Sequence, residues 1–313
     1  MYESLDGGIS IQIPLMYALG NADWYDGYDT LNVDPMDGIT SAFFDWRQGA
    51  VPITISRKEE RQNSSTDRII DLMKSKIMQA ELGFKELFSR AILQGSYASG
   101  GTSLFTNASS PSNGALGPEP LGLLISPTPT SSVTVGNVNQ GTQSWWQNKF
   151  KQSALTSANK ASDFLFEFDS IFNDCAKGPG GPPDFGLCDQ VTYQLFNMAY
   201  YQVYRRMADT NNDFPFENIK FRNMTLTWDE FIPDVMNNTL TPTSGAGTCW
   251  LINTKFCSVK YDKETNFVAT PFQKPVNQDA KSAHILWMGN VCISNRRKLG
   301  VYFNIPRSLA WSV

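Results

Sequence analysis

The chain has 313 residues, of which 41% are hydrophobic, 12% aromatic and only 18% charged. This length is sufficient for a large core or for several lobes, and low charge combined with many aromatic residues favours a surface that is buried against partners. The formal net charge of −4 argues against a dedicated nucleic-acid binder, which needs a strongly basic face. This net charge is compatible with a container for DNA, whose inner wall must not bind the packaged DNA tightly.

The cysteines and the apolar runs narrow the class of protein further. The five cysteines are irregularly spaced and form no C-x-x-C pair, so we expect reduced, mostly buried thiols rather than a zinc or redox site. No run of about 18 apolar residues occurs, so we expect no helix that spans a membrane.

The first two predicted elements are strands joined by an acidic, turn-rich segment. Residues 9–18 alternate apolar and polar side chains, and residues 41–56 contain a second extended run. The segment between them holds five aspartates: Asp23, Asp26, Asp29, Asp34 and Asp37. These features predict a long hairpin arm. Because an isolated hairpin is marginally stable in water, we expect the arm to lie on something else, such as a neighbouring subunit.

A long helix is predicted over residues 63–95. Residues 63–67 provide an N-cap and an acidic first turn. Apolar side chains then recur every three or four residues, at Ile69, Met73, Ile77, Ala80, Phe84, Phe88 and Ala91. A helix of about 28 residues would span about 42 Å, which is long for a globular domain. This length favours a spine that crosses a flat molecule.

The remainder of the chain is predicted to alternate loops, helices and short strands. Residues 96–144 favour loops with short strands, because they are rich in Gly, Ser, Thr, Pro and Asn. We predict helices over residues 160–175 and 190–207, with a sharp break at residues 177–183. Single strands are predicted at residues 184–187, 218–228 and 248–261. Residues 282–305 are predicted to form a pair of strands with a turn at residues 295–298.

A search for catalytic or metal-binding chemistry gives no candidate residues. The single histidine, His284, lies in an apolar run and is expected to be structural. One histidine does not readily build a His-based metal site or the usual triad. We therefore expect no catalytic, cofactor-binding or metal-binding residues and no enzymatic activity. The acidic loop around Asp23-Trp24 leaves a hydrolase as an alternative, although a solvated or partner-facing loop is the favoured interpretation.

Short motifs are spread along nearly the whole chain, from Gly7 to Trp311. They are Gly7-Gly8-x-x-Ile11-x-Ile13-Pro14, Phe44-Asp45-Trp46-Arg47, Glu60-Arg61-Gln62-Asn63, Gly141-Thr-Gln-Ser-Trp145-Trp146, Pro183-Asp184-Phe185, Leu251-Ile252-Asn253-Thr254-Lys255, Pro271-Phe272, Asn277-Gln278-Asp279-Ala280, Leu286-Trp287-x-Gly289-Asn290 and Ser294-Asn295-Arg296-Arg297. Each motif is weak individually. In this order and spacing they resemble the major capsid proteins of tailed bacteriophages, which have the Hong Kong 97-type fold.

The resemblance implies an α+β fold of that type and a division of the chain into five segments. Relatives carry a longer N-terminal arm before the Gly-Gly pair, so the first segment is expected to be a remnant. The segments are a short N-terminal remnant (1–8), an extended loop that lies on an adjacent subunit (9–56), a peripheral domain (57–162) with the spine helix 63–95, an axial domain at the capsomer centre (163–245), and the return strands of the peripheral domain (246–313).

The function that the resemblance implies is structural. Copies of the chain would form hexamers, pentamers and an icosahedral shell that encloses double-stranded DNA, as part of a virion assembled in the host bacterial cytoplasm. The expected partners are portal, scaffolding and cement proteins, with loose non-specific contact to the DNA and no contact with a membrane. An encapsulin-like nanocompartment shell shares the fold and is the closest alternative. A monomeric binding module is a further one.

Two expectations concern how subunits join. Some relatives form Lys–Asn isopeptide bonds from the extended loop, but residues 9–56 contain no lysine, so we predict no such crosslink from them. We expect the acidic loop to dock on Arg57, Arg61 and Arg68 of a neighbour, and the basic triplet at residues 296–298 either to solubilise a turn or to contact an acidic neighbour or DNA. The candidate inter-subunit contacts are Asp23, Asp26, Asp29, Trp46, Arg57, Arg61, Arg68, Arg296 and Arg297.

Overall fold

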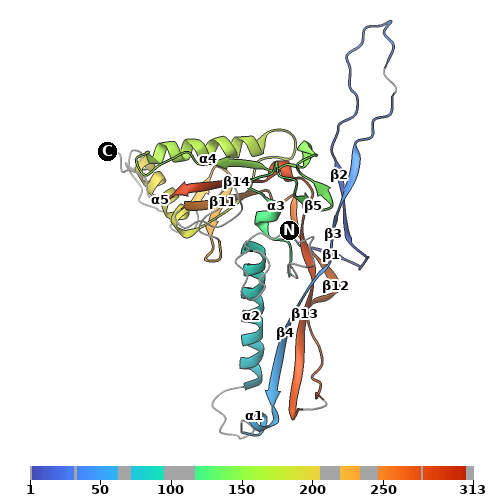
Figure 1. Ribbon diagram of the computed structural model, residues 1–313, viewed down its shortest axis with the longest axis vertical. Coiled ribbons are helices and arrows are strands. Elements are labelled where there is room, and N and C mark those ends of the chain that lie inside the picture. The colour runs from blue at the N-terminus through green and yellow to red at the C-terminus, as the bar shows by residue number, and fades with distance from the viewer. Residues whose placement is uncertain are drawn as a thin grey trace.

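The computed structural model describes residues 2–31, 34–62, 72–94, 117–204, 219–232, 246–275 and 278–307. Figure 1 shows an elongated molecule: a long sheet runs vertically beside helix α2 (Leu72–Gln94), a helix-covered lobe extends to one side, and a hairpin projects beyond the rest. Helices are combined with separate sheets, so the predicted α+β class is confirmed.

A four-stranded sheet forms the long vertical part of the molecule in Figure 1. Its strands lie in the order β1 (Tyr2–Leu5), β12 (Cys257–Ala269), β13 (Ala280–Ile293) and β4 (Arg47–Ser56). β13 and β4 pair antiparallel along the whole of β4. The 14 residues of β13 extend about 46 Å at about 3.3 Å per residue. Residues 2–5, expected to be part of a remnant, supply an edge strand.

Helix α2 confirms the predicted spine helix over its described part and packs on this sheet. Phe84 meets Phe267 with their ring centroids 5.1 Å apart, and Phe88 meets Trp287 at 4.9 Å. Gly49 on β4 allows the close approach, because a Cβ there would lie 3.0 Å from the Phe84 ring. A short helix, α1 (Arg57–Gln62), follows β4. The predicted N-cap at residues 63–67 lies outside the described residues.

The lateral lobe is built on a six-stranded sheet. The strand order is β7 (Lys149–Gln152), β14 (Gly300–Pro306), β11 (Ala246–Ile252), β8 (Phe185–Cys188), β10 (Met224–Trp228) and β9 (Ile219–Phe221). The two predicted helices form as α4 (Ala161–Ala176) and α5 (Gln190–Tyr204) and pack on it (Figure 1). Phe164 and Phe168 of α4 meet Phe196 of α5 at centroid distances of 4.7 and 4.6 Å. The central strands β11 and β14 are almost continuously buried, which is typical of a sheet covered on both faces.

The arm is a two-stranded hairpin of β2 (Ile11–Met16) and β3 (Ile39–Phe44). Alternate side chains of β2 are buried, and they join a core cluster that contains Val135 and Trp146. Val135 belongs to a small hairpin, β5 (Thr134–Val135) and β6 (Val138–Asn139), whose turn residue Gly136 has a φ of 60°. A Cβ on Gly136 would lie 2.9 Å from the Cβ of Ala42, so the base of the arm needs a glycine here.

The predicted second strand of the arm, residues 41–56, divides into two strands. β3 ends the arm at Phe44, whereas β4 pairs with β13 in the four-stranded sheet. The bend between them is held by two hydrogen bonds: Asn290 Nδ2 donates to the Asp45 carbonyl at 2.9 Å, and Trp46 Nε1 donates to the Gly8 carbonyl at 2.8 Å. The chain therefore changes sheet at this point.

The prediction that residues 282–305 form a strand pair is wrong about the pairing. β13 and β14 both form, but they belong to different sheets. Between them lies a 3-10 helix, η3 (Arg296–Lys298), which turns Arg296 into the interior. Residues 246–307 consequently contribute strands to both sheets. The strands predicted at residues 218–228 and 248–261 form as well, each divided by a turn.

Candidate subunit-contact surfaces

The loop that joins β2 to β3, residues 17–38 and named the tip loop here, exposes acidic and aromatic side chains together. It contains five aspartates and no lysine or arginine. Trp24 and Tyr28 are fully exposed, at 103% and 105%, and Tyr25 is 67% exposed. Large aromatic side chains gathered on a surface are typical of a site that binds another protein.

Hydrogen bonds within the turn Asp26–Asp29 fix the shape of the tip loop. The Asp29 amide donates to the Asp26 carbonyl at 2.8 Å, the Asp26 amide donates to Asp29 Oδ2 at 2.9 Å, and the Gly27 amide donates to Asp26 Oδ1 at 2.8 Å. All three aspartates predicted as contacts, Asp23, Asp26 and Asp29, are exposed.

Trp46, another predicted contact, packs at the base of the arm instead of presenting a free surface. Its ring is half-buried against the core, and its Nε1 bonds to the Gly8 carbonyl. The neighbouring Asp45 carbonyl accepts from Asn290, whose Oδ1 accepts the amide of Glu119 at 2.9 Å. Trp46 thus positions the arm within its own chain.

The basic surface predicted after β4 already has acidic neighbours. Arg57 Nη1 lies 3.8 Å from Asp279 Oδ1, and Lys274 Nζ lies 3.3 Å from the same oxygen. Glu59 and Glu60 of α1 lie between Arg57 and Arg61 in sequence, and Glu60 pairs with Lys281 at 2.7 Å. Arg57 and Arg61 are exposed, so a partner can reach them. Arg68 lies outside the described residues.

Arg296, predicted to lie at a surface turn, is fully buried, with 0% of its surface exposed. Its guanidinium donates to the carbonyls of Leu124 and Trp146 at 2.8 and 3.1 Å, and to the side-chain oxygens of Gln140 and Asn148 at 2.9 and 3.1 Å. Burial lowers the pKa of Arg296 to about 9. Because its donors are used inside the chain, Arg296 is a structural cation and not a surface contact.

The two residues that follow Arg296 have different roles. Lys298 is buried, and its Nζ donates to the carbonyls of Ala176, Lys177 and Gly178 at 3.2, 2.8 and 2.9 Å. A cation at these last carbonyls stabilises the C-terminal end of α4. Arg297 alone is exposed, so it is the one member of the triplet that a partner can reach.

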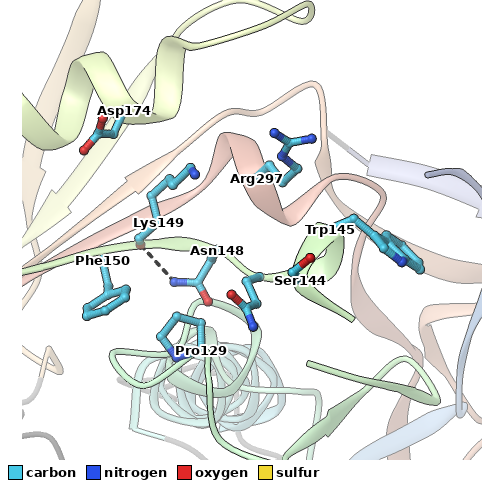
Figure 2. A pocket seen from close by; sticks show the side chains of 9 residues that line it. Pro129, Ser144, Trp145, Asn148, Lys149, Phe150, Asp174 and Arg297 are labelled. Carbon is cyan, nitrogen blue, oxygen red and sulfur yellow. Dashed lines mark hydrogen bonds between the residues drawn. The ribbon is translucent and has the colours of Figure 1, made fainter. Parts of the chain in front are cut away.

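Arg297 lines a surface cavity of about 340 Å³ together with Lys149 and Phe150 of β7 (Figure 2). Pro129 and Asn148 also line it, and α4 contributes Asp174. Lys149 and Phe150 could not be identified from the sequence, because nothing in their local pattern separates them from other edge-strand residues. The fold alone brings these distant segments together.

The histidine and the cysteines were the residues considered for metal binding or redox chemistry. Among the described residues, no group of three or more His, Cys, Asp or Glu side chains could hold a metal ion, and His284 is exposed on β13. The five cysteines are free, as predicted, and four are buried. Burial raises the pKa of Cys175 to about 12, which keeps that thiol protonated. No helix in the described ranges is long and apolar enough to cross a membrane.

Solved structures match the chain over nearly its whole length. The capsid asymmetric unit of cyanophage A-1(L) is 11% identical with a TM-score of 0.65, and the match covers 97% of this chain and 89% of that chain. The capsid of cyanophage P-SCSP1u is 10% identical with a TM-score of 0.59, over 96% of this chain and 85% of that one. This chain has a capsid-protein fold.

The capsid fold confirms the Hong Kong 97-type architecture predicted from the short motifs. It is also present in a bacterial shell: the SrpI encapsulin complex from Synechococcus elongatus PCC 7942 is 10% identical with a TM-score of 0.56, over 100% of this chain and 87% of that chain. No family model and no curated protein sequence matches the chain. The capsid fold is therefore evident from the backbone arrangement and not from overall sequence similarity.

Proposed function

We propose that this chain is a structural shell protein, which assembles with copies of itself into hexamers, pentamers and a closed icosahedral shell around double-stranded DNA. The observation that carries the proposal is the arm, which holds the exposed rings of Trp24, Tyr25 and Tyr28 away from the core of its own chain, on a capsid fold (Figure 1). Contact with a neighbour would remove this apolar surface from water, which is favourable by roughly 25 cal/mol per Å².

We assign parts of the fold to roles in that shell. Within residues 9–56, the arm is the extended loop that lies on an adjacent subunit. The four-stranded sheet with α2 is the peripheral domain. The lobe that carries α4 and α5, including residues 163–245, is the axial domain at the capsomer centre, and its sheet is completed by β11 and β14 from residues 246–313.

The remaining partners follow from the same proposal. We propose portal, scaffolding and cement proteins as the further partners of a shell that packages DNA. Contact with the packaged DNA is loose and non-specific, which the net charge of −4 supports. The protein would be assembled in the host bacterial cytoplasm and would reside in the virion.

Electron microscopy of the purified full chain tests the proposal directly. We expect rings of five or six copies, or closed particles, together with elution well ahead of a 34.9 kDa monomer in size-exclusion chromatography. A chain that remains monomeric at high concentration and across a range of salt would contradict the shell function.

An encapsulin-like nanocompartment is the second candidate, because the SrpI encapsulin match covers 100% of this chain. The content of particles purified from the native source separates the two functions. DNA-filled particles with a portal and tail support the phage capsid. Particles that contain protein cargo and no DNA support the nanocompartment.

A further inference from the structure

The cavity in Figure 2 carries two cations that no carboxylate of the described chain neutralises. Lys149 Nζ and the Arg297 guanidinium have no ion pair or side-chain hydrogen bond among the described residues. The one acid that lines the cavity, Asp174, is already paired with Lys177 at 2.6 Å. The cavity therefore has a positive potential and favours an anionic occupant.

A third cation adds to this potential from beneath the floor of the cavity. Asn148 lines the cavity and is only 3% exposed, and its Oδ1 accepts from Arg296 Nη2 at 3.1 Å and from the Ser126 amide at 3.0 Å. The described hydrogen-bond partners of Arg296 are neutral, and water screens a buried charge poorly. Because these hydrogen bonds fix Asn148, the floor of the cavity is already formed before a ligand binds, which reduces the entropic cost of binding.

The apolar part of the cavity suits an occupant that carries an aromatic ring. Phe150 is 50% exposed beside Lys149. In Figure 2, Phe150 and Pro129 lie toward one side of the cavity, and the charged ends of Lys149 and Arg297 toward the other. The volume of about 340 Å³ is near the lower end of ligand cavities, about 300–1,000 Å³. It accommodates one or two side chains of a peptide segment.

The chain itself contains a segment with the complementary chemistry. Residues 23–29 read Asp-Trp-Tyr-Asp-Gly-Tyr-Asp, in which three carboxylates alternate with three exposed rings. We propose that this segment of one copy binds in the cavity of a second copy, with its carboxylates facing Lys149 and Arg297 and a ring against Phe150. The proposal rests on the shell function and names the contact that seats the arm. The chain's own tip loop projects away from the lobe (Figure 1), so a second copy supplies the segment.

The surface around Arg57 and Arg61 is the competing acceptor for the tip loop. Its acids, like Asp174 of the cavity, are paired with lysines: Asp279 with Lys274 and Glu60 with Lys281. The cavity differs in offering a concave site in which an exposed ring, Phe150, lies beside Lys149, so it suits both the carboxylates and the rings of the segment.

Charge exchange in the full chain tests the contact. Lys149→Glu/Arg297→Glu reverses the cavity, Asp23→Lys/Asp26→Lys reverses the tip loop, and a fourfold variant combines them. The yield of assembled particles, measured by sedimentation and microscopy, should fall at least about tenfold for each pair and recover in the fourfold variant. The matched control is Lys220→Glu/Lys255→Glu, which makes the same charge change at exposed lysines outside the cavity and should assemble like the parent. Circular dichroism of every unassembled variant verifies the fold.

A second tip-loop variant tests whether the lysine substitutions act through charge or by disrupting the turn Asp26–Asp29. Asp23→Asn/Asp26→Asn/Asp29→Asn removes the charge but keeps the oxygens that accept the turn's amides, and it should also lower the yield. Normal assembly of the cavity variant, or no recovery in the fourfold variant, would overturn the cavity contact and leave the shell function intact. Loss of assembly with Arg57→Glu/Arg61→Glu but not with the cavity variant would also overturn it. A parent that never assembles contradicts the shell function, and the cavity contact with it.

Discussion

Arg296 Nη2 donates a hydrogen bond of 3.1 Å to Asn148 Oδ1 in the interior of the chain. Asn148 in turn bonds the backbone of Ser126 in both directions, with its Nδ2 donating to the carbonyl at 2.8 Å and its Oδ1 accepting the amide at 3.0 Å. One guanidinium therefore holds together loops that are far apart in the sequence. It also fixes Asn148, which precedes Lys149 in the lining of the cavity.

Replacing Arg296 should be strongly destabilising. Arg296→Met removes the donors of several buried carbonyl and amide oxygens, so we expect the free energy of unfolding to fall by about 3–5 kcal/mol. Urea unfolding of the unassembled chain measures this change. The matched control is Arg297→Met, one residue along and exposed, which should change stability by no more than about 0.5 kcal/mol. Equal losses in the two variants would contradict the structural role of Arg296.

Local periodicity was sufficient to predict the helices and the arm. The apolar stripe through Phe84 and Phe88 predicts the face of α2 that packs on the four-stranded sheet, and α4 and α5 begin within one residue of their predicted starts. These signals are local, because a helix forms its hydrogen bonds within one segment. The alternation of β2 likewise predicts which of its side chains are buried.

Strand partners and buried cations could not be predicted in the same way. A strand's sequence does not specify its neighbour, so the pairing of β4 with β13 and of β14 with β11 depends on contacts distant in the sequence. Arg296 and Arg297 are indistinguishable in a run of basic residues. The acceptors that the fold places beside η3, among them the carbonyls of Leu124 and Trp146, bind Arg296 in the interior and leave Arg297 outside. The cavity at Lys149 was missed for the same reason.

Two tryptophans on the arm should respond in opposite ways to truncation. Trp24 is fully exposed, so Trp24→Ala should leave the melting temperature of the unassembled chain unchanged and reduce particle yield. Trp46 bonds to Gly8 and packs on the core, so Trp46→Ala should lower the free energy of unfolding by about 2–4 kcal/mol. Thermal unfolding and sedimentation measure the two effects separately. Normal particle yield from Trp24→Ala would argue against a partner at the tip loop.

Mature particles should separate into monomers on a denaturing gel, because we predict that the arm supplies no lysine for a covalent crosslink between subunits. Residues 9–56 contain no lysine, so this segment cannot supply the lysine of a Lys–Asn isopeptide bond. The expected result after boiling in detergent and reductant is a single band at the monomer mass of 34.9 kDa. A ladder of multimers whose crosslinked peptides map to residues 9–56 would contradict the prediction.

Glu119 should make stability fall as the pH rises toward neutral. Burial raises the pKa of its carboxyl to about 7, and the charge of Arg47 only partly opposes this. Between the ordinary pKa of 4.5 and about 7, the folded chain binds this proton and the unfolded chain does not. Stability is therefore lost across that window as the pH rises, by on the order of 3 kcal/mol, and changes little above it.

Glu119→Gln isolates this contribution from the other titrating groups. The variant keeps a neutral side chain of the same shape, so its stability relative to the parent should increase from pH 4.5 to pH 7 and then remain constant. Urea unfolding of both unassembled chains at half-unit steps of pH measures the difference. Parallel pH profiles for the two chains would show that the carboxyl is not buried as the structure places it.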